Sequence, residues 1–442
     1  MLKIDSSGYS PAILAKIISL AANHKSFDQA AEAVTTTCEF SISGRHVNRL
    51  SEEIGQEMAK ARDEQTENYV HHRREPCTEP APEVVAIALD GGRVQTRGSG
   101  QGPGVHQRGW KEDKIACLLT LKASSFTEDP HPEPPKCFLD APRVDKLVRD
   151  MQANRVRRQE DELPQLEELA LGKEKQPSSS KIADADKDDD DDRKWPPKRT
   201  KRSRSCVATM RDSDEFGKMV AAESYRRNFQ SAQRGALLGD GAAWIWNLHA
   251  KWFSSLTPIT DFAHALTYLY VTATALASDV ATRWQLYVGW MTLAWQGKVG
   301  EVIADLKTRA AKLEPHTGPA KLPATDPREL LRRTIGYLKN NESRMNYPDY
   351  RKQGLPVSSS MVESLVKEFN YRVKGTEKFW DNPEGAEAIL QLRAAKLSDD
   401  DRLKEHIYDR PGCVFRRYKK TKPTPQKTEA AAVEATDNRV VA

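Results

Sequence analysis

The sequence predicts a mixed α/β fold that follows a helical N-terminal region. Apolar runs at residues 84–94 and 236–248 contain Asp-Gly, as buried strands and the turns after them do. Residues 10–72 and 262–340 instead carry the apolar spacing of helices. Strands in one part of the chain and helices in others favour the α/β class over an all-helical protein.

Length and composition set broad limits on the protein. A chain of 442 residues allows about two to four domains. The net charge of +5 is too small to establish a polyanionic partner. None of the six cysteines forms a CxxC pair, so we expect neither a zinc knuckle nor a disulfide framework. No secretory signal is recognisable, and the apolar stretch 262–277 is short for a bilayer span, so we expect a cytoplasmic protein without a membrane partner.

Residues 1–75 are predicted to form a helical domain. Ser10 is a candidate N-cap with Pro11 in the first helical position, and a second short helix follows Ser26. After the polar stretch 35–43, a longer helix begins at residue 44. This outline is typical of a helix-turn-helix.

The longer helix, which begins at residue 44, starts with polar and basic side chains. In a helix-turn-helix they would reach base edges and phosphates in the major groove: Arg45, His46, Asn48 and Arg49. The alternative is a helical cap or dimerisation arm, because this pattern is common.

The first part of a strand-containing core is predicted over residues 76–262. Strands are expected at 84–94 and 115–123, joined by a Gly-rich hairpin loop at 97–113. Residues 128–205 are expected to be a disordered charged loop with one amphipathic helix near 142–170. Its basic block, 194–204, could touch the DNA backbone or be simply solvated.

Structure is expected to resume at residue 207. Ser213 is a candidate N-cap for the next helix, and Trp244 and Trp246 are interpreted as core or sheet-face residues of a strand. A short strand then leads into a helix near residue 262. The later boundaries are a helical insertion at 263–353 with a break at 314–327, a last part of the core at 354–410 with helices at 359–373 and from 384, and a flexible tail at 411–442.

Two aspartates carry the chemical prediction. Asp90 and Asp240 each stand at the C-terminal end of an apolar strand, beside glycine. Carboxylate oxygens at such a position suit a hard cation. Either aspartate alone is a weak signal, because Asp-Gly after a strand is also a common turn.

Several stretches resemble one protein family. They are ALDGGRV, VATMRDSDEFG, RGALLGDGAAWIWNL, ITDFAHA and GLPVSSSMVESLVKEFNYRVKGTEKFWDNPEGAEAILQLRAA, spread from residue 84 to about 402. The chain resembles bacterial insertion-sequence transposases of the Kra-type group, which are relatives of the eukaryotic Mutator-like elements and belong to the DDE class.

This resemblance implies a ribonuclease-H-like catalytic core with a large all-helical insertion between the second and third acidic residues. The three acids fall on Asp90, Asp240 and Glu363, which would hold two Mg²⁺ ions, with Mn²⁺ as a substitute. The implied reactions are strand cleavage at the element ends and strand transfer into target DNA. The implied partners are double-stranded DNA with terminal inverted repeats, target DNA and further copies of the chain, as a homodimer or larger complex near the bacterial nucleoid.

Other site residues keep two interpretations. Glu363 could instead form an exposed ion pair with Lys367. Asp261 and His264, a D-x-x-H unit that follows the second acid, could adjoin the metal site, or could be a helix cap and a core histidine.

Basic and aromatic residues after Glu363 suit phosphate contact and base stacking: Tyr371, Arg372, Lys374, Lys378 and Trp380. For Trp380, packing under the terminal helix is the alternative. Two other functions also remain open, namely a DNA-binding regulator derived from an inactive transposase and a ribonuclease-H-like nuclease that cuts without joining.

Overall fold

The computed structural model describes most of the chain outside its longest charged segments. The described residues are 7–73, 77, 79–96, 109–154, 163–170, 200–316, 321–358, 368–369, 371–373, 380 and 382–410. Within them the fold is mixed α/β, as the sequence predicts. No helix in this part of the chain combines the length and the apolar character needed to cross a bilayer.

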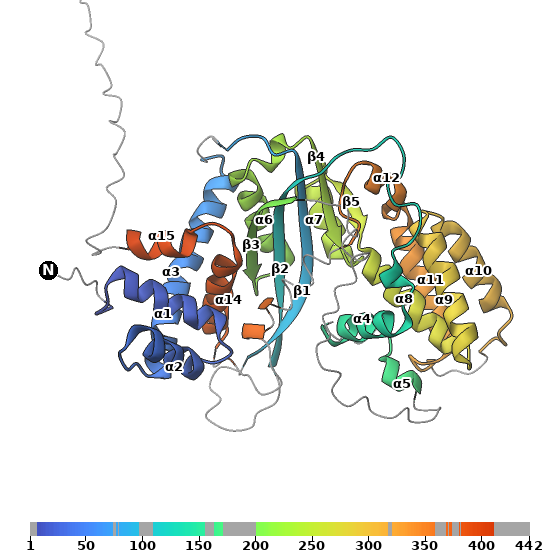
Figure 1. The fold of residues 1–442 in the computed structure, drawn as a ribbon, viewed down its shortest axis with the longest axis horizontal. Helices are drawn as coiled ribbons and strands as arrows, with labels where there is room; N and C mark the ends of the chain where they lie inside the picture. Colours follow the sequence, from blue (N-terminus) through green and yellow to red (C-terminus); the bar gives the residue numbers. More distant parts are fainter. Residues whose placement is uncertain are drawn as a thin grey trace, which may run out of the picture.

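A five-stranded mixed sheet lies at the centre of the molecule (Figure 1). Its spatial order is β3-β2-β1-β4-β5. Strands β1, β2 and β3 pair antiparallel, whereas β4 and β5 run parallel to β1. The strands are β1 (Val84–Thr96), β2 (Gly109–Lys122), β3 (Thr200–Thr209), β4 (Arg234–Gly239) and β5 (Thr257–Thr260).

Both faces of the sheet are buried, which explains the continuous apolar runs in its strands. Side chains at odd positions of β1, such as Ile87, pack with α6 (Ser213–Arg226) and α7 (Ala243–Trp252). Side chains at even positions, such as Ala86, belong to a larger hydrophobic cluster with α8 (Phe262–Leu276) and α14 (Pro383–Leu397). We call the face of the even positions the inner face.

The three N-terminal helices share this larger cluster. They are α1 (Pro11–Asn23), α2 (Phe27–Cys38) and α3 (Gly44–Val70), and Ser10, Ser26 and Ser43 cap them. The predicted cap Ser10 is therefore confirmed, and so is a second helix that follows Ser26. The polar stretch 35–43 separates two helices as predicted, but only from residue 39, because α2 continues to Cys38 and the hydroxyls of Thr35, Thr36 and Thr37 bond to carbonyls one turn earlier.

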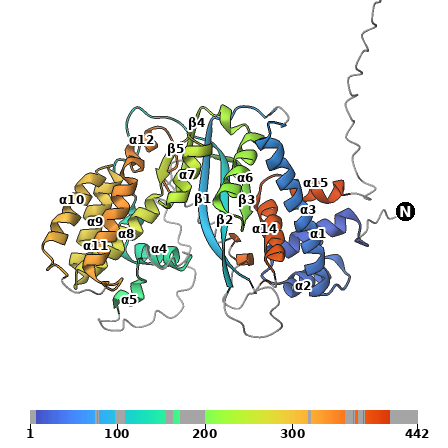
Figure 2. The ribbon, with the colours of Figure 1, turned by 180° about the vertical axis from the view of Figure 1, so that it is seen from behind.

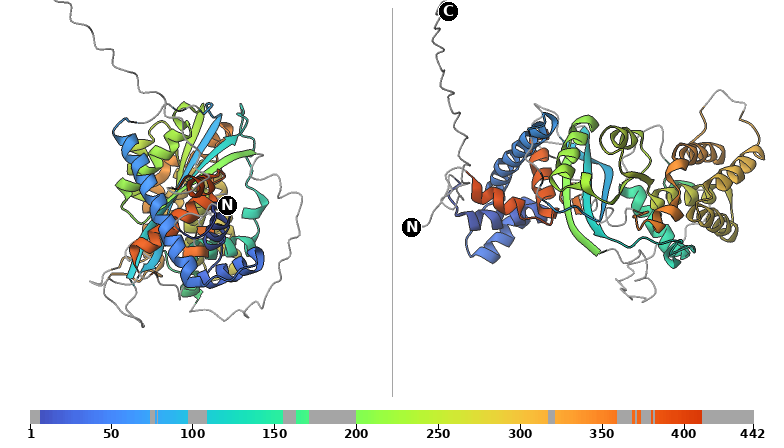
Figure 3. Two further views of the ribbon diagram at one scale, coloured as in Figure 1. Left: turned by 90° about the vertical axis from the view of Figure 1, so that its left-hand side faces the viewer. Right: turned by 90° about the horizontal axis from the view of Figure 1, so that it is seen from above.

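The predicted insertion is helical where it is described. It comprises α8, α9 (Val280–Trp295), α10 (Val299–Ala311), α11 (Pro327–Asn341), η4 (Glu342–Arg344) and α12 (Tyr347–Lys352). Seen from above, these helices and the N-terminal helices lie at opposite ends of the molecule with the sheet between them (Figure 3). The insertion therefore lies next to β5, the edge strand of the sheet that neighbours β4.

Several predicted boundaries are wrong. Strand β2 begins at Gly109, so residues 109–113 pair with β1 and do not belong to the hairpin loop. The apolar run 236–248 is not one strand, because Gly241 has a φ of 102° and the chain then enters α7. Asp212, one residue before Ser213, caps α6.

The prediction of a disordered loop over residues 128–205 is wrong at both ends, although helical structure is present where one helix was expected, near 142–170. The first end contains η1 (Lys136–Phe138), α4 (Ala141–Asn154) and α5 (Leu166–Ala170), of which α4 and α5 pack near α8 (Figure 2). Asp129 fixes this end through an ion pair with the buried Arg351. The other end forms the edge strand β3, where charged side chains are common. Residues 171–199, with most of the charged blocks, lie outside the described residues.

The last described helix, α15 (Arg402–Asp409), is attached to α6 by ionic contacts, and η3 (Phe229–Ser231) follows α6. Arg402 donates to Glu223 at 2.7 Å, and Arg226 donates to the same carboxylate at 2.8 Å. Burial alone would raise the pKa of Glu223, but the two guanidinium groups outweigh it and lower this pKa to about 2.

The close packing of α3 on α14 gives a test of the fold. A Cβ atom at Gly55 of α3 would lie 2.7 Å from Cβ of Ala388, whereas one at Gly289 of α9 would meet no atom within 4 Å. We expect Gly55→Ala to lower the free energy of unfolding by about 2 kcal/mol through overpacking. Gly289→Ala should raise it by roughly 0.5–1 kcal/mol, because alanine favours a helix interior. Urea denaturation of both variants measures this, and equal effects would contradict the helix packing.

Candidate active site

Asp90 lies within β1 and not at its end, so the predicted strand-end position is wrong. Strand β1 continues through Gly91 and Gly92 because β2 pairs with it as far as Thr96 and Gly109. The pairing with β4, however, stops at Ala88. Asp90 is therefore two residues beyond the last paired residue on the β4 side, where the edge of β1 is no longer covered by a strand. Its Oδ1 accepts a hydrogen bond from the Gly91 amide at 2.7 Å.

Asp240 directly follows the last residue of β4, as predicted. Its Oδ1 accepts a hydrogen bond from the Ala242 amide at 2.9 Å, which fixes the carboxylate against the turn that leads into α7. Gly241 in this turn has a left-handed φ of 102°, which glycine adopts without strain. The Asp-Gly sequence thus ends the strand and sets the direction of the carboxylate.

The register of β1 and β4 brings the two aspartates together. Ala88 pairs with Leu238 in parallel strands, so a continuation by two residues on each strand places Asp90 beside Asp240. Neighbouring strands are about 4.8 Å apart. Both aspartates have the parity of Ala88 and Leu238, whose side chains lie in the inner-face cluster. Both predicted acids therefore follow the last β1–β4 pair by two residues, with the parity of the inner face.

Asp261 extends the same row by one strand. Gly239 pairs with Thr260 of β5, and the Asp261 amide donates to the Gly239 carbonyl at 2.9 Å. Asp261 is buried and caps α8 by accepting from the Ala263 amide at 3.0 Å. His264 lies one turn later, with Nε2 3.9 Å from Oδ2 of Asp261. The capping interpretation holds for Asp261, and its place beside Asp240 also keeps it next to the predicted metal site.

Asp113 was not among the predicted site residues, although it is a buried carboxylate on the same face. It pairs with Gly92, two residues from Asp90, and a Cβ atom at Gly92 would lie 2.7 Å from a carboxylate oxygen of Asp113. Gly92 thus provides the space that this carboxylate occupies. The sequence could have shown this only if residues 109–113 had been assigned to β2.

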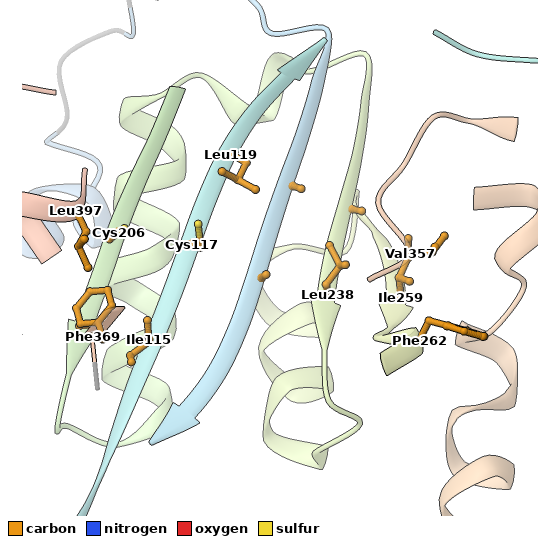
Figure 4. Packing of buried hydrophobic residues seen from close by; sticks show 14 of the residues in the cluster. Ile115, Cys117, Leu119, Cys206, Leu238, Ile259, Phe262, Val357, Phe369 and Leu397 are labelled. Carbon is orange, nitrogen blue, oxygen red and sulfur yellow. The ribbon is translucent and has the colours of Figure 1, made fainter. Parts of the chain in front are cut away.

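Glu363, Lys374 and Lys378 lie outside the described residues. The nearest described residues on either side of Glu363 with apolar side chains in the core are Val357 and Phe369. Both belong to the inner-face cluster, which Figure 4 shows in part. Val357 accepts a hydrogen bond from the Phe262 amide at 3.0 Å, next to Asp261. Val357 and Phe369, on either side of Glu363 in the sequence, thus both pack on the inner face.

The described acids have the right donor chemistry for Mg²⁺ or Mn²⁺, because both ions prefer carboxylate oxygens. Among the residues that the structure describes, no group of three or more His, Cys, Asp or Glu side chains is arranged to hold a metal ion. Of the three predicted acids, the structure describes two, Asp90 and Asp240.

The predicted DNA-contacting residues of α3 lie in its first turns. Arg45 and Arg49 are exposed, four residues apart, and Arg49 contacts Nδ1 of His46 at 2.9 Å. Asn48 donates to Glu52 at 3.3 Å. The two arginines therefore point to solvent from one side of the helix, where a phosphate backbone could approach.

Arg372 is not a surface residue, which contradicts its predicted contact with DNA. Its side chain is buried between the rings of Phe27 and Trp380 and donates to the Ala21 carbonyl at 2.8 Å. Burial lowers the pKa of Arg372 to about 10. It satisfies the C-terminal end of α1, where helix carbonyls lack partners within the helix.

Trp380 also takes part in packing. Its ring lies edge-on to Phe27 at 6.3 Å, its Nε1 donates to the Val373 carbonyl at 3.0 Å, and its backbone forms a bridge with Thr96. This arrangement favours the packing interpretation over base stacking. Tyr371, in contrast, is half exposed and lies under the ammonium group of Lys25.

Trp244 and Trp246 lie on α7 and not on a strand, so the sheet-face interpretation is wrong, whereas both side chains pack against a core cluster, as the other interpretation predicts. Trp244 packs against Phe216 of α6. The indole of Trp246 donates to Oδ1 of Asn341 at 3.1 Å, and Arg344 lies over its ring. These contacts connect α7 to the helical insertion beside Asp240.

No protein-family model matches the chain, and no curated protein sequence matches it.

The position of Arg372 gives a test of its role. We expect Arg372→Ala to lower the free energy of unfolding by about 2–4 kcal/mol, because it removes packing and leaves a buried carbonyl without its donor. Arg49→Ala, on the exposed side of α3, should change it by less than about 0.5 kcal/mol. Equal losses in urea denaturation would show that Arg372 has no special structural role.

Proposed function

We propose that the protein is a DNA transposase of the DDE class, in which Asp90, Asp240 and Glu363 hold two divalent metal ions. The observation that carries this proposal is the register of β1 and β4, whose last pair, Ala88 with Leu238, stands two residues before Asp90 and Asp240. Two carboxylates on neighbouring strands of one face are suited to share a pair of cations. Glu363 completes the set through the family resemblance.

The strand arrangement supports a ribonuclease-H-like core. Three antiparallel strands are followed by two strands parallel to β1, and the two described acids stand on β1 and directly after β4. The helices from α8 to α12 come between Asp240 and the position of Glu363, where the resemblance places an insertion.

The chain's own residues would bind and orient the reacting groups. The Gly91 amide donates to one carboxylate oxygen of Asp90, and the Ala242 amide donates to one of Asp240. These hydrogen bonds orient both carboxylates before a ligand binds. When bound, two Mg²⁺ ions supply the Lewis acidity that activates an attacking water or 3′-hydroxyl and stabilises the leaving oxygen. Asp261, buried and capping α8, fixes the backbone next to Asp240.

The proposed DNA partner is double-stranded DNA that ends in inverted repeats, followed by target DNA. Arg45 and Arg49 would contact phosphates from α3, and His46 and Asn48 would approach base edges. Since one transposition event joins two element ends, we propose that a homodimer or larger complex acts near the bacterial nucleoid.

The test of this function is cleavage and joining of a linear duplex that ends in the DNA flanking the gene, with Mg²⁺ present. We expect the wild-type protein to nick this duplex at the element end and to join the freed end to a plasmid. Asp240→Asn should lower both rates by more than the roughly 10–100-fold that loss of an outer-shell metal partner costs. Product lengths on denaturing gels measure both steps.

The control is Asp214→Asn, the same change on the exposed surface of α6, where Asp214 forms ion pairs with Lys218 and Lys251. It should leave both rates unchanged. Cleavage without joining would instead indicate a nuclease. Wild-type activity in Asp240→Asn would contradict the proposed site.

A further inference from the structure

The turn after β4 is enclosed by α11 of the helical insertion. A Cβ atom at Gly241 would lie 2.7 Å from Cε2 of Tyr337 and 2.9 Å from Nδ2 of Asn341. Both neighbours are closer than a side chain at position 241 could tolerate. The Asp240-Gly241 turn is therefore in direct van der Waals contact with α11.

Tyr337 bonds directly to the backbone of Asp240. Its hydroxyl donates to the Asp240 carbonyl oxygen at 3.0 Å. Its ring is stacked on Tyr268 of α8, with ring centroids 3.8 Å apart and an interplanar angle of 9°. The stack restricts the tyrosine ring, so the hydroxyl is held in one place and fixes the peptide that carries the acid.

Asn341 connects three elements that follow Asp240 in the chain. The side chain is 2% exposed, and its Oδ1 accepts hydrogen bonds from the Trp246 indole at 3.1 Å and from the Thr260 hydroxyl at 3.4 Å. Its Nδ2 donates to the Tyr337 carbonyl at 2.9 Å. One amide group thus joins α7, β5 and α11 around the turn.

We propose that Tyr337 and Asn341 are positioning residues that set Asp240 for metal binding, so that the helical insertion controls the metal site. This inference rests on the proposed function. Asp240 follows the end of its strand, where the sheet no longer restrains the backbone. A metal ligand must be held within about 0.5 Å of its working geometry, and such restraint comes from the partners around it. In this protein, Tyr337 and Asn341 of α11 supply this restraint to the Asp240 backbone.

The structure also explains why this restraint comes from the insertion. Tyr268 and Tyr337 lie on two helices of the insertion, whereas Trp246 and Thr260 belong to the elements that flank Asp240. A shift of α11 relative to the sheet would break the bond to the Asp240 carbonyl. The insertion and the metal site are thus coupled through a small set of hydrogen bonds.

The test compares two variants that each remove one tyrosine hydroxyl from the insertion. Tyr337→Phe removes the bond to Asp240. Tyr287→Phe removes a bond of the same kind, because the Tyr287 hydroxyl donates to the Phe138 carbonyl at 3.0 Å. The full-length proteins are titrated with Mn²⁺, and free Mn²⁺ is measured by electron paramagnetic resonance. Melting temperatures without metal are measured in parallel.

We expect Tyr337→Phe to weaken Mn²⁺ binding by about 10-fold, as the loss of a supporting partner does at metal sites. Tyr287→Phe should bind Mn²⁺ like the wild type, although both variants melt at similarly lowered temperatures. Asn341→Ala provides a second, independent variant with the same expected loss.

Two outcomes separate the failure of this inference from that of the proposed function. If Asp240→Asn loses Mn²⁺ binding while Tyr337→Phe and Asn341→Ala bind like the wild type, the positioning role is wrong and the proposed metal site stands. If the wild-type protein itself binds no Mn²⁺, both proposals are wrong. Equal weakening in Tyr337→Phe and Tyr287→Phe would also overturn the positioning role, because the effect would then come from general destabilisation.

Discussion

The parallel pairing of β1 with β4 is the interaction on which the candidate site depends. It joins residues that are about 150 positions apart in the chain, and its register alone decides whether Asp90 and Asp240 meet. A slip by one residue would turn one carboxylate to the opposite face, among the side chains of α6 and α7. Because both faces of β1 are buried in apolar clusters, such a slip would also move its apolar side chains between the clusters, and the register is strongly specified.

The helices that pack on the sheet stabilise the pairing of β1 with β4 from the β3 side and from the β5 side. On the β3 side, α14 and the N-terminal helices fill the inner face, with Arg372 closing the end of α1. On the β5 side, the insertion packs through α8 and reaches the turn after Asp240 through α11. The N-terminal helices and the insertion, which are far apart in space, therefore both support the short central region where the aspartates lie.

Much of the fold could be predicted from local sequence, because its signals are local. Ser10 and Ser26 mark helix starts, and the apolar runs of β1 and β4 mark buried strands. The position of Asp90 within its strand could not be predicted, because Gly91 and Gly92 look like a turn in the sequence and only their pairing with β2 shows that the strand continues. Likewise, the buried state of Arg372 depends on α1 and α2, which lie more than 300 residues earlier. Tyr337 and Asn341 carry no motif, and only the packing of α11 on Gly241 reveals them.

The site of metal binding is the most direct test of the central claim. Crystals of the full-length protein grown with Mn²⁺ would locate the ion by its anomalous scattering. We expect anomalous density between the carboxylates of Asp90 and Asp240, on the inner face of the sheet. Density elsewhere in the molecule, with the two aspartates free of metal, would contradict the assignment of these residues as the metal-binding acids.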